Sequence, residues 1–235
     1  MRLMAKSKII KQLAKGEIEL ETALRELRVL LMDFGRPEIL DWVNCELEGY
    51  PHTDDENANL PDYRIAPGVL KGSYTIGNKI VKNISIPLMP NAPDSLMRFV
   101  SEIPFYEGIS SLRLMIGNNA DTMSPIAMRL SGQHNLLLQT NAAIHMDGLL
   151  ESYVEVSRVS VQKVIESVSN KTMDILSFIE REFGVLDELD IEVDTKTDDQ
   201  KETIVNNIYL IMYDARKNIV IGDNNKVRGL DISQT

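Results

Sequence analysis

Residues 18–35, IELETALRELRVLLMDFG, determine the character of the first part of the fold. Apolar side chains recur there every three or four residues, which is typical of a helix with one buried face. They are Leu20, Leu24, Leu27, Leu31 and Phe34. Gly35 ends the pattern, and residues 36–49 repeat it after Pro37, a residue suited to the first turn of a helix. With a helix expected over residues 3–14, the sequence predicts an N-terminal helical hairpin or three-helix unit.

The middle of the chain changes from helical to mixed patterns. Residues 69–88 contain β-branched runs on either side of Gly77-Asn78 and predict two strands joined by a turn. Residues 94–103 predict a short helix, whereas residues 108–138 fit helix or strand equally. Residues 147–183 predict one long helix with a break near Ser157. The fold class expected is α+β: a predominantly helical globular domain with a small antiparallel sheet, followed by a β-prone C-terminal tail.

Three parts are expected along the chain: a globular domain (1–186), an acidic linker (187–203) and a β-prone assembly tail (204–235). The run IYLIMY at residues 208–213 would be apolar on both faces of a strand. Residues 204–235 contain no proline and have little net charge, which is typical of segments that stack between molecules. The alternative is that these strands complete a sheet with residues 79–86 of the same molecule.

Composition limits the function and the compartment. The 235 residues have a net charge of −10, which argues against general nucleic-acid binding. Cys45 is the single cysteine, so no intrachain disulfide can form, and this suits a reducing compartment. No apolar run approaches the roughly 20 residues that cross a bilayer. We therefore expect a cytoplasmic protein.

Few residues indicate chemistry. The three histidines have no metal-ligand spacing, and no phosphate-binding loop or nucleophile motif is present. We therefore expect no catalytic residue, metal or cofactor, and no enzyme. The side chains that could bind a partner are Trp42, Tyr50, Tyr63 and Arg64. The alternative for Arg64 is an ion pair, with Asp62 or with an acid on the helices, that holds its loop in place.

Three stretches together resemble the AbiTii family of bacterial abortive-infection proteins. They are GEIELETALRELRVL (16–30), ILDWVNCELEGYP with LPDYRIAPG (39–51 and 60–68), and YVEVSRVSVQKVIESVSNKTMDILSFIEREF (153–183). The resemblance covers roughly residues 15–186. It implies a role in defence against bacteriophage, and it implies no catalytic residues.

The segment IVIGDNNKV, residues 219–227, is similar to the core of the RIP homotypic interaction motif, which forms amyloid in cell-death signalling. Val220 stands where that motif has glutamine. We expect self-assembly through this segment, whose residues are Ile219, Val220, Ile221, Gly222, Asp223, Asn224, Asn225 and Val227.

The function expected is a non-enzymatic interaction protein of anti-phage defence. Its partners would be copies of itself, in a homo-oligomer, and another defence protein or phage component, with no nucleic acid. One alternative is an effector toxin that acts on membrane through the basic residues of segment 1–15, or through an unrecognised active site. Another is a structural subunit that dimerises by exchanging tail strands.

Overall fold

The computed structural model describes residues 6–52, 60–117 and 124–213. The fold is α+β, with mostly helical secondary structure and a small antiparallel sheet, which confirms the predicted class. Within the described residues the chain forms two compact units. The helical unit takes segments 6–43 and 170–213, and the sheet unit takes segment 44–169 between them.

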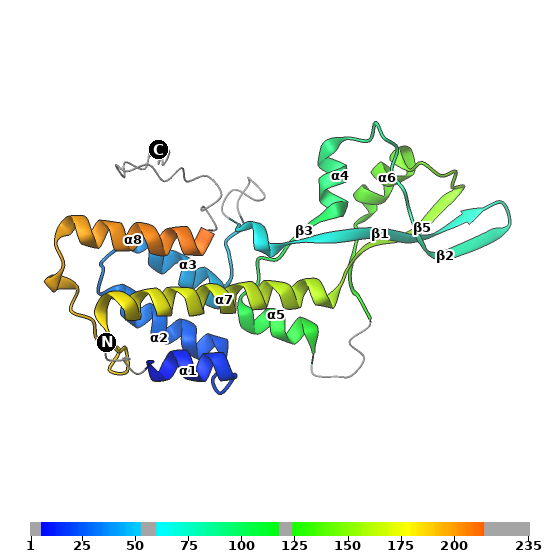
Figure 1. Cartoon of the computed structure of the whole chain (residues 1–235). Helices are drawn as coiled ribbons and strands as arrows, with labels where there is room; N and C mark the ends of the chain where they lie inside the picture. The colour runs from blue at the N-terminus through cyan, green and yellow to red at the C-terminus, as the bar shows by residue number, and fades with distance from the viewer. Residues whose placement is uncertain (1–5, 53–59, 118–123, 214–235) are drawn as a thin grey trace. The chain divides into compact units, whose positions relative to one another are not determined.

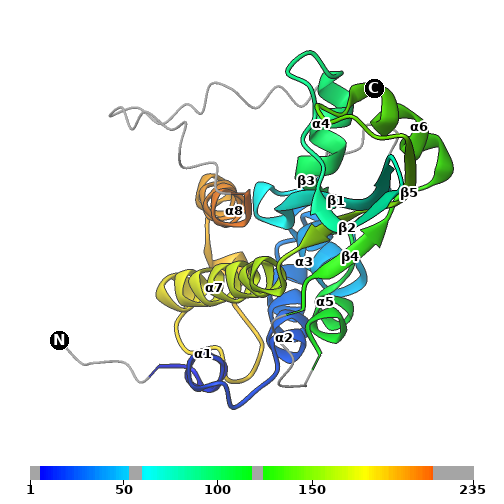
Figure 2. The same ribbon diagram turned by 90° about the vertical axis from the view of Figure 1, so that its right-hand side faces the viewer.

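The helical unit is built from two segments that lie far apart in the sequence. The first supplies α1 (Lys8–Lys15), α2 (Leu20–Met32) and most of α3 (Pro37–Glu48). The second supplies the C-terminal part of α7 (Arg158–Phe183), then η2 (Val193–Thr195) and α8 (Asp198–Tyr213). In Figures 1 and 2, this part of α7 lies between α8 on one side and α1 with α2 on the other.

The apolar stripe predicted for α2 forms the core of the helical unit. Leu24, Leu27 and Leu31 are fully buried, and Leu20 is nearly so. Phe34 meets the ring of Phe183 edge-on, with 5.8 Å between the ring centroids. The three- and four-residue spacing was therefore sufficient to identify the buried face of this helix.

Residues 208–213 are helical, so the prediction of a strand there was wrong. The buried side chains of α8 are spaced three or four residues apart, which places them on one face of a helix. The alternating period of a strand would divide them between two faces. They are Ile204, Val205, Ile208, Ile211 and Met212. The boundary expected between linker and tail, at residues 203 and 204, falls inside this helix.

Residues 187–203 are not a solvated linker throughout, so that prediction was wrong. The last residues of this acidic run, from Asp198 onward, form the first turns of α8. Thr197 N donates to Gln200 Oε1 at 3.0 Å and Gln200 N donates to Thr197 Oγ1 at 3.4 Å, a reciprocal cap. Asp198 and Asp199 occupy the first turn, where the helix dipole favours negative charge. Ile191 and Val193 are buried.

The sheet unit contains antiparallel strands in the order β2-β1-β5-β4, and β3 pairs with the beginning of β1. Their bounds are β1 (Ile65–Ile76), β2 (Lys79–Ser85), β3 (Glu102–Pro104), β4 (Ile126–Arg129) and β5 (Gly148–Val156). The hairpin predicted around Gly77-Asn78 is confirmed, because β1 and β2 pair on either side of it. Helices α4 (Asp94–Ser101) and α6 (Gly132–Asn141) lie on one face of this sheet (Figure 1).

Residues 147–183 do not form one long helix as predicted. Residues 148–156 form β5, in which Ser152, Val154 and Val156 are buried with the alternating period of a strand. The expected break near Ser157 is where strand changes to helix. Segment 108–138, which the sequence left open, contains α5 (Ile109–Ile116), β4 and the beginning of α6, and residues 118–123 lie outside the described part.

Candidate functional site

Three of the four side chains singled out for partner binding surround one buried carboxylate, Glu46. Glu46 lies on the stripe of α3 that also carries Ile39, Trp42 and Val43, and it is fully inaccessible to solvent. A carboxylate in that position requires compensation, because an unpaired buried charge is strongly destabilising.

Arg64 supplies the compensating charge. Its Nη2 donates to Glu46 Oε2 at 2.5 Å and its Nε donates to Glu46 Oε1 at 3.3 Å. The second terminal nitrogen, Nη1, donates to the backbone oxygens of Phe105 at 3.0 Å and Glu107 at 2.7 Å. Both charged side chains are fully buried. The alternative interpretation of Arg64, an ion pair with an acid on the helices, is confirmed.

Two tyrosines complete the shell around Glu46. The hydroxyl groups of Tyr50 and Tyr63 each donate to Glu46 Oε1 at 2.6 Å, and the Arg64 guanidinium lies 4.7 Å from the centre of the Tyr50 ring. Burial, together with the Glu46 carboxylate, raises the pKa of the Tyr50 hydroxyl. Burial alone would lower the pKa of Arg64, but the Glu46 carboxylate outweighs it and the pKa of the guanidinium is raised.

Two glycines, Gly49 and Gly108, allow the end of α3 and segment 105–108 to pack closely against each other. Tyr50 N donates to Tyr106 O at 2.7 Å, and Gly49 pairs with Glu107 in an isolated bridge. Gly49 has φ +109, and a Cβ there would lie 2.8 Å from Tyr106 O. Gly108 is as tightly placed against the Leu47 backbone. The Glu46 centre therefore holds the end of α3 against segment 105–108 and the start of β1.

This arrangement is suited to holding the fold. Trp42 and Arg64 are fully buried and Tyr50 is 7% exposed, so of the four candidates only Tyr63 keeps a substantial exposed part. Sequence reasoning missed Glu46. Its position on the apolar stripe of α3 was the available signal, since an acid on a buried face demands a cation.

A second polar cluster, around Ser7 and Glu180, links the start of α1 to the end of α7 within the helical unit. Ser7 is fully buried, and both its N and its Oγ donate to Glu180 Oε1 at 2.6 Å. Lys6 Nζ donates to Glu180 Oε2 at 2.6 Å, and Leu186 N donates to Ser7 Oγ at 2.9 Å. Burial would raise the pKa of Glu180, but the hydrogen bonds from Lys6 and Ser7 prevail and lower it.

The apolar side of α1 faces into the protein. Ile9, Ile10 and Leu13 are buried, while Lys8 and Lys11 are exposed. A helix that lies on a bilayer needs its apolar side free to enter the headgroup region. In this structure α1 presents its lysines and buries that side.

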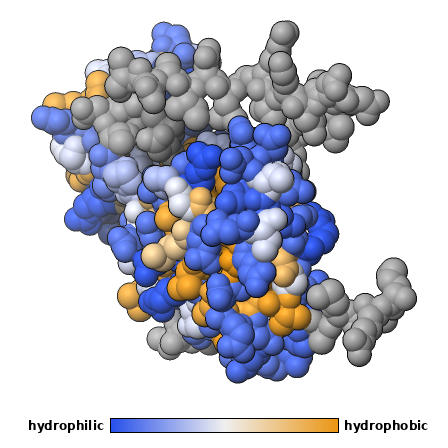
Figure 3. All heavy atoms as spheres, turned by 90° about the vertical axis from the view of Figure 1, so that its left-hand side faces the viewer, coloured by the Kyte–Doolittle hydropathy of each residue, from blue (hydrophilic) through white to orange (hydrophobic). Residues whose placement is uncertain are grey.

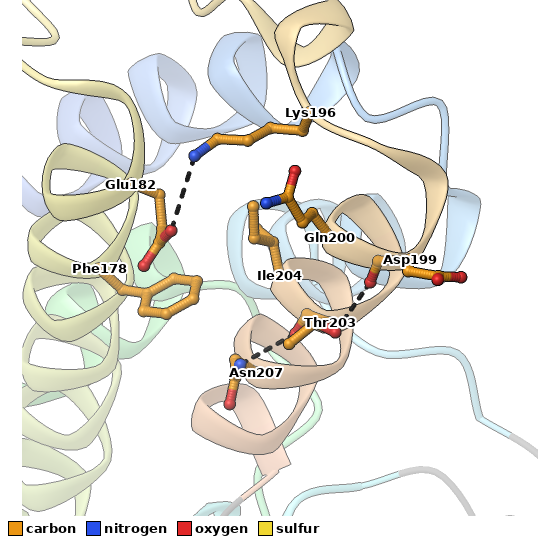
Figure 4. Close-up of a pocket in the computed structure, with 8 residues that line it drawn as sticks. All are labelled: Phe178, Glu182, Lys196, Asp199, Gln200, Thr203, Ile204 and Asn207. Atoms are coloured by element: carbon orange, nitrogen blue, oxygen red, sulfur yellow. Dashed lines mark hydrogen bonds and ion pairs between the residues drawn. The ribbon is translucent and has the colours of Figure 1, made fainter. Parts of the chain in front are cut away.

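An open pocket of about 240 Å³ lies in the helical unit between the end of α7 and the first half of α8 (Figure 4). Its apolar surface comes from Phe178 and Ile204. The polar lining residues are Glu182, Lys196, Asp199, Gln200, Thr203 and Asn207. Lys196 Nζ lies 3.9 Å from Glu182 Oε2, an ion pair at the rim.

On the side of the molecule that Figure 3 shows, hydrophobic surface forms a strip between hydrophilic side chains.

The histidines contact neighbouring side chains. His134 stacks on Phe99 with 4.3 Å between ring centroids, and His145 Nε2 lies 3.2 Å from Asp147 Oδ1. Within the described residues, no group of three or more His, Cys, Asp or Glu side chains is placed to hold a metal ion. None of the helices in the described segments combines the length and apolar character needed to cross a membrane. The expected self-assembly residues, 219–227, lie outside the described part.

The fold and its buried centre define an α+β protein in which the conspicuous charged and aromatic residues hold the structure together. The chain matches the family model AbiTii over residues 7–205, and it therefore belongs to the AbiTii family. This family implies a role in abortive infection, a defence against bacteriophage. No curated protein and no solved structure matches the chain.

Proposed function

We propose that this protein is a non-enzymatic interaction protein of abortive-infection defence, which assembles with copies of itself through residues 219–227. Family membership supports the defence role. The β-branched run Ile219-Val220-Ile221, followed by Gly222 and the Asp-Asn-Asn triplet, supports the mode of assembly. Assembly would bring AbiTii domains to high local concentration around a partner, which is another defence protein or a phage component.

The observation that carries the proposal is the match to the AbiTii family, and the anchoring of α8 adds where the helical unit stands relative to the segment in the sequence. The apolar face of α8 is buried, and Lys171 Nζ donates to Ile211 O at 2.8 Å in the last turn of the helix. A lysine in this position satisfies a backbone oxygen that the helix itself leaves open. The helical unit thus includes the residues up to Tyr213, and the proposed assembly segment begins six residues later in the sequence.

The membrane-directed effector has weaker support. Its sequence argument relied on the apolar residues Ile9, Ile10 and Leu13 of α1, and these side chains are buried. No feature of the described residues favours this alternative.

The test separates assembly from folding by cutting at the end of α8. A chain ending at Tyr213 keeps every residue of α8, whereas a chain ending at Thr203 loses its buried face. We expect the first to stay folded and lose large assemblies in sedimentation velocity, and the second to unfold.

Point variants of the full chain refine the test. Ile221→Asp places a charge inside the proposed stack and should abolish growth of thioflavin T fluorescence, because a buried charge has no partner there. Val220→Gln is the matched control, since it restores the glutamine of the related motif and should preserve assembly. Full-length protein that remains monomeric at all concentrations, or Ile221→Asp protein that assembles normally, contradicts the proposal.

A further inference from the structure

We propose that the pocket between α7 and α8 binds residues 218–228 of the same chain, so that the assembly segment is held on the helical unit until it is released. The binding itself stands on the pocket and the sequence. Its regulatory consequence rests on the function proposed above, because the same segment cannot occupy the pocket and stack with other copies at once.

The segment has the length to reach the pocket. From Tyr213 back to Thr203 is ten residues of helix, or about 15 Å at ~1.5 Å per residue. An extended chain covers this in about five residues at ~3.3 Å each. The proposal requires the chain to reverse direction after α8, which would bring Asn218 level with Thr203 and direct the following residues toward Gln200 and Lys196.

The charges on the two sides are complementary. Residues 218–228 carry the basic side chains of Lys226 and Arg228 against the single acid Asp223, and Arg216 and Lys217 stand immediately before them in the chain. The pocket carries the carboxylates of Glu182 and Asp199 against Lys196, and Arg181 lies beside it, 3.6 Å from Glu182 Oε1. Lys196, Asp199 and Gln200 belong to the acidic run 187–202, which holds eight acids and two lysines in all. Opposite charges on partner surfaces favour and steer docking.

The pocket also matches the segment in its uncharged groups. Phe178, which is partly exposed, offers an apolar surface to the side chains of residues 219–221. Two amides offer hydrogen bonds: Gln200 accepts through Oε1 from Thr197, and Asn207 donates through Nδ2 to Thr203 O. Among the described residues, Gln200 Nε2 and Asn207 Oδ1 make no hydrogen bond, and Figure 4 shows both side chains at the pocket. They suit the backbone and the asparagine side chains of the segment.

Docking of a tethered segment is favoured by its high effective concentration, which is in the millimolar range for short linkers. A weak contact is therefore enough to keep the segment on its own protomer. Any partner that covers the pocket, or a rise in ionic strength that screens the charges, frees it for stacking.

Intrachain cross-linking of the full-length protein tests the docking directly. In a Cys45→Ser background, Thr203→Cys with Asn218→Cys should form a disulfide within one chain at low protein concentration under mild oxidation. Glu202→Cys with Asn218→Cys is the matched control, because Glu202 is only one residue further from Tyr213 along α8 than Thr203 and does not line the pocket. The first pair should cross-link faster, and 0.5 M salt should remove the difference. Equal rates for the two pairs, or products only between chains, overturn the proposal.

A pocket-filling variant tests the consequence. Asn207→Trp places a large ring in the hollow and should abolish the preferred cross-link and shorten the lag before assembly. Asn170→Trp makes the same substitution at an exposed position of α7 outside the pocket and should leave both unchanged. A chain that cross-links as expected but never assembles refutes the proposed function alone. A chain that assembles without the preferred cross-link refutes the docking alone.

Discussion

Glu46 and Arg64 form an ion pair in which neither side chain has any contact with solvent. The pair joins the end of α3 to the start of the sheet, and the guanidinium continues to two backbone oxygens of segment 105–108. A centre that is this enclosed acts through the stability of the fold, and the following predictions separate that role from recognition.

Replacing Arg64 with methionine should lower the free energy of unfolding by about 3–5 kcal/mol, because it leaves the buried Glu46 carboxylate without its cation. Urea unfolding measures this loss. The control is Arg129→Gln, which breaks an exposed pair with Glu151 and should cost less than about 1 kcal/mol. An Arg64→Met protein that retains full stability but no longer binds its partner protein would show that Arg64 is a recognition residue.

Tyr50→Phe should lower the free energy of unfolding by about 1.5–3 kcal/mol, since it removes a hydrogen bond to a charged acceptor. It should also change the alkaline limb of stability. The pKa of folded Tyr50 lies above its unfolded value of about 10, so its contribution is complete below pH ~10 and is lost as the pH rises further. Unfolding measured from pH 8 to 11 should therefore show a shallower decline in Tyr50→Phe protein than in the parent. A steeper decline would contradict this account.

Gly49→Ala should destabilise the protein more than Gly77→Ala. Both glycines have positive φ, +109 and +55, so alanine at either position is strained by about 1–2 kcal/mol. At Gly77 the added methyl group meets nothing within 4 Å, whereas at Gly49 it meets Tyr106 O at 2.8 Å. Thermal unfolding of both variants gives the comparison. Equal losses would mean that segment 105–108 shifts away at little cost.

Acid should loosen α1 through Glu180. Its folded pKa lies below the ordinary value of 4.5, so its contribution is complete above pH ~4.5 and is lost as the pH falls through the folded pKa. Hydrogen exchange of the α1 amides from pH 6 to 3, corrected for intrinsic rates, should show faster opening toward the acid end. Glu180→Gln should open readily at every pH and lose this pH dependence. A parent protein whose α1 protection does not change with pH would refute the assignment.

Where the buried faces repeat locally, the sequence predicted the fold well. The leucine stripe of α2 and the turn at Gly77-Asn78 are local patterns, and both are confirmed. The error at the end of α8 arose where composition was taken in place of periodicity. The apolar run at residues 208–213 suggested a strand because it was considered alone; continued back to Ile204 and Val205, it has the spacing of a helix.

The candidate site was predicted in part. For Arg64 the alternative to partner binding was an ion pair, with Asp62 or with an acid on the helices, and the second of these is observed. Its partner Glu46 was not named, because the separation of 18 residues leaves no local pattern that joins them. The bonds between Ser7 and Glu180 cross 173 residues and could not be read from local spacing at all. The pocket between α7 and α8 was missed because its lining residues had been divided among the predicted globular domain, linker and tail.

The Ser7–Glu180 link has a consequence for synthesis. A ribosome adds about 5–20 residues per second, so roughly 10–35 s separate the appearance of Ser7 from that of its acceptor. During this interval Ile9, Ile10 and Leu13 belong to a nascent chain that has not yet made their final surroundings. Maturation of the helical unit therefore waits until Glu180 has been translated, and a product that stops before this residue cannot form the Ser7–Glu180 link.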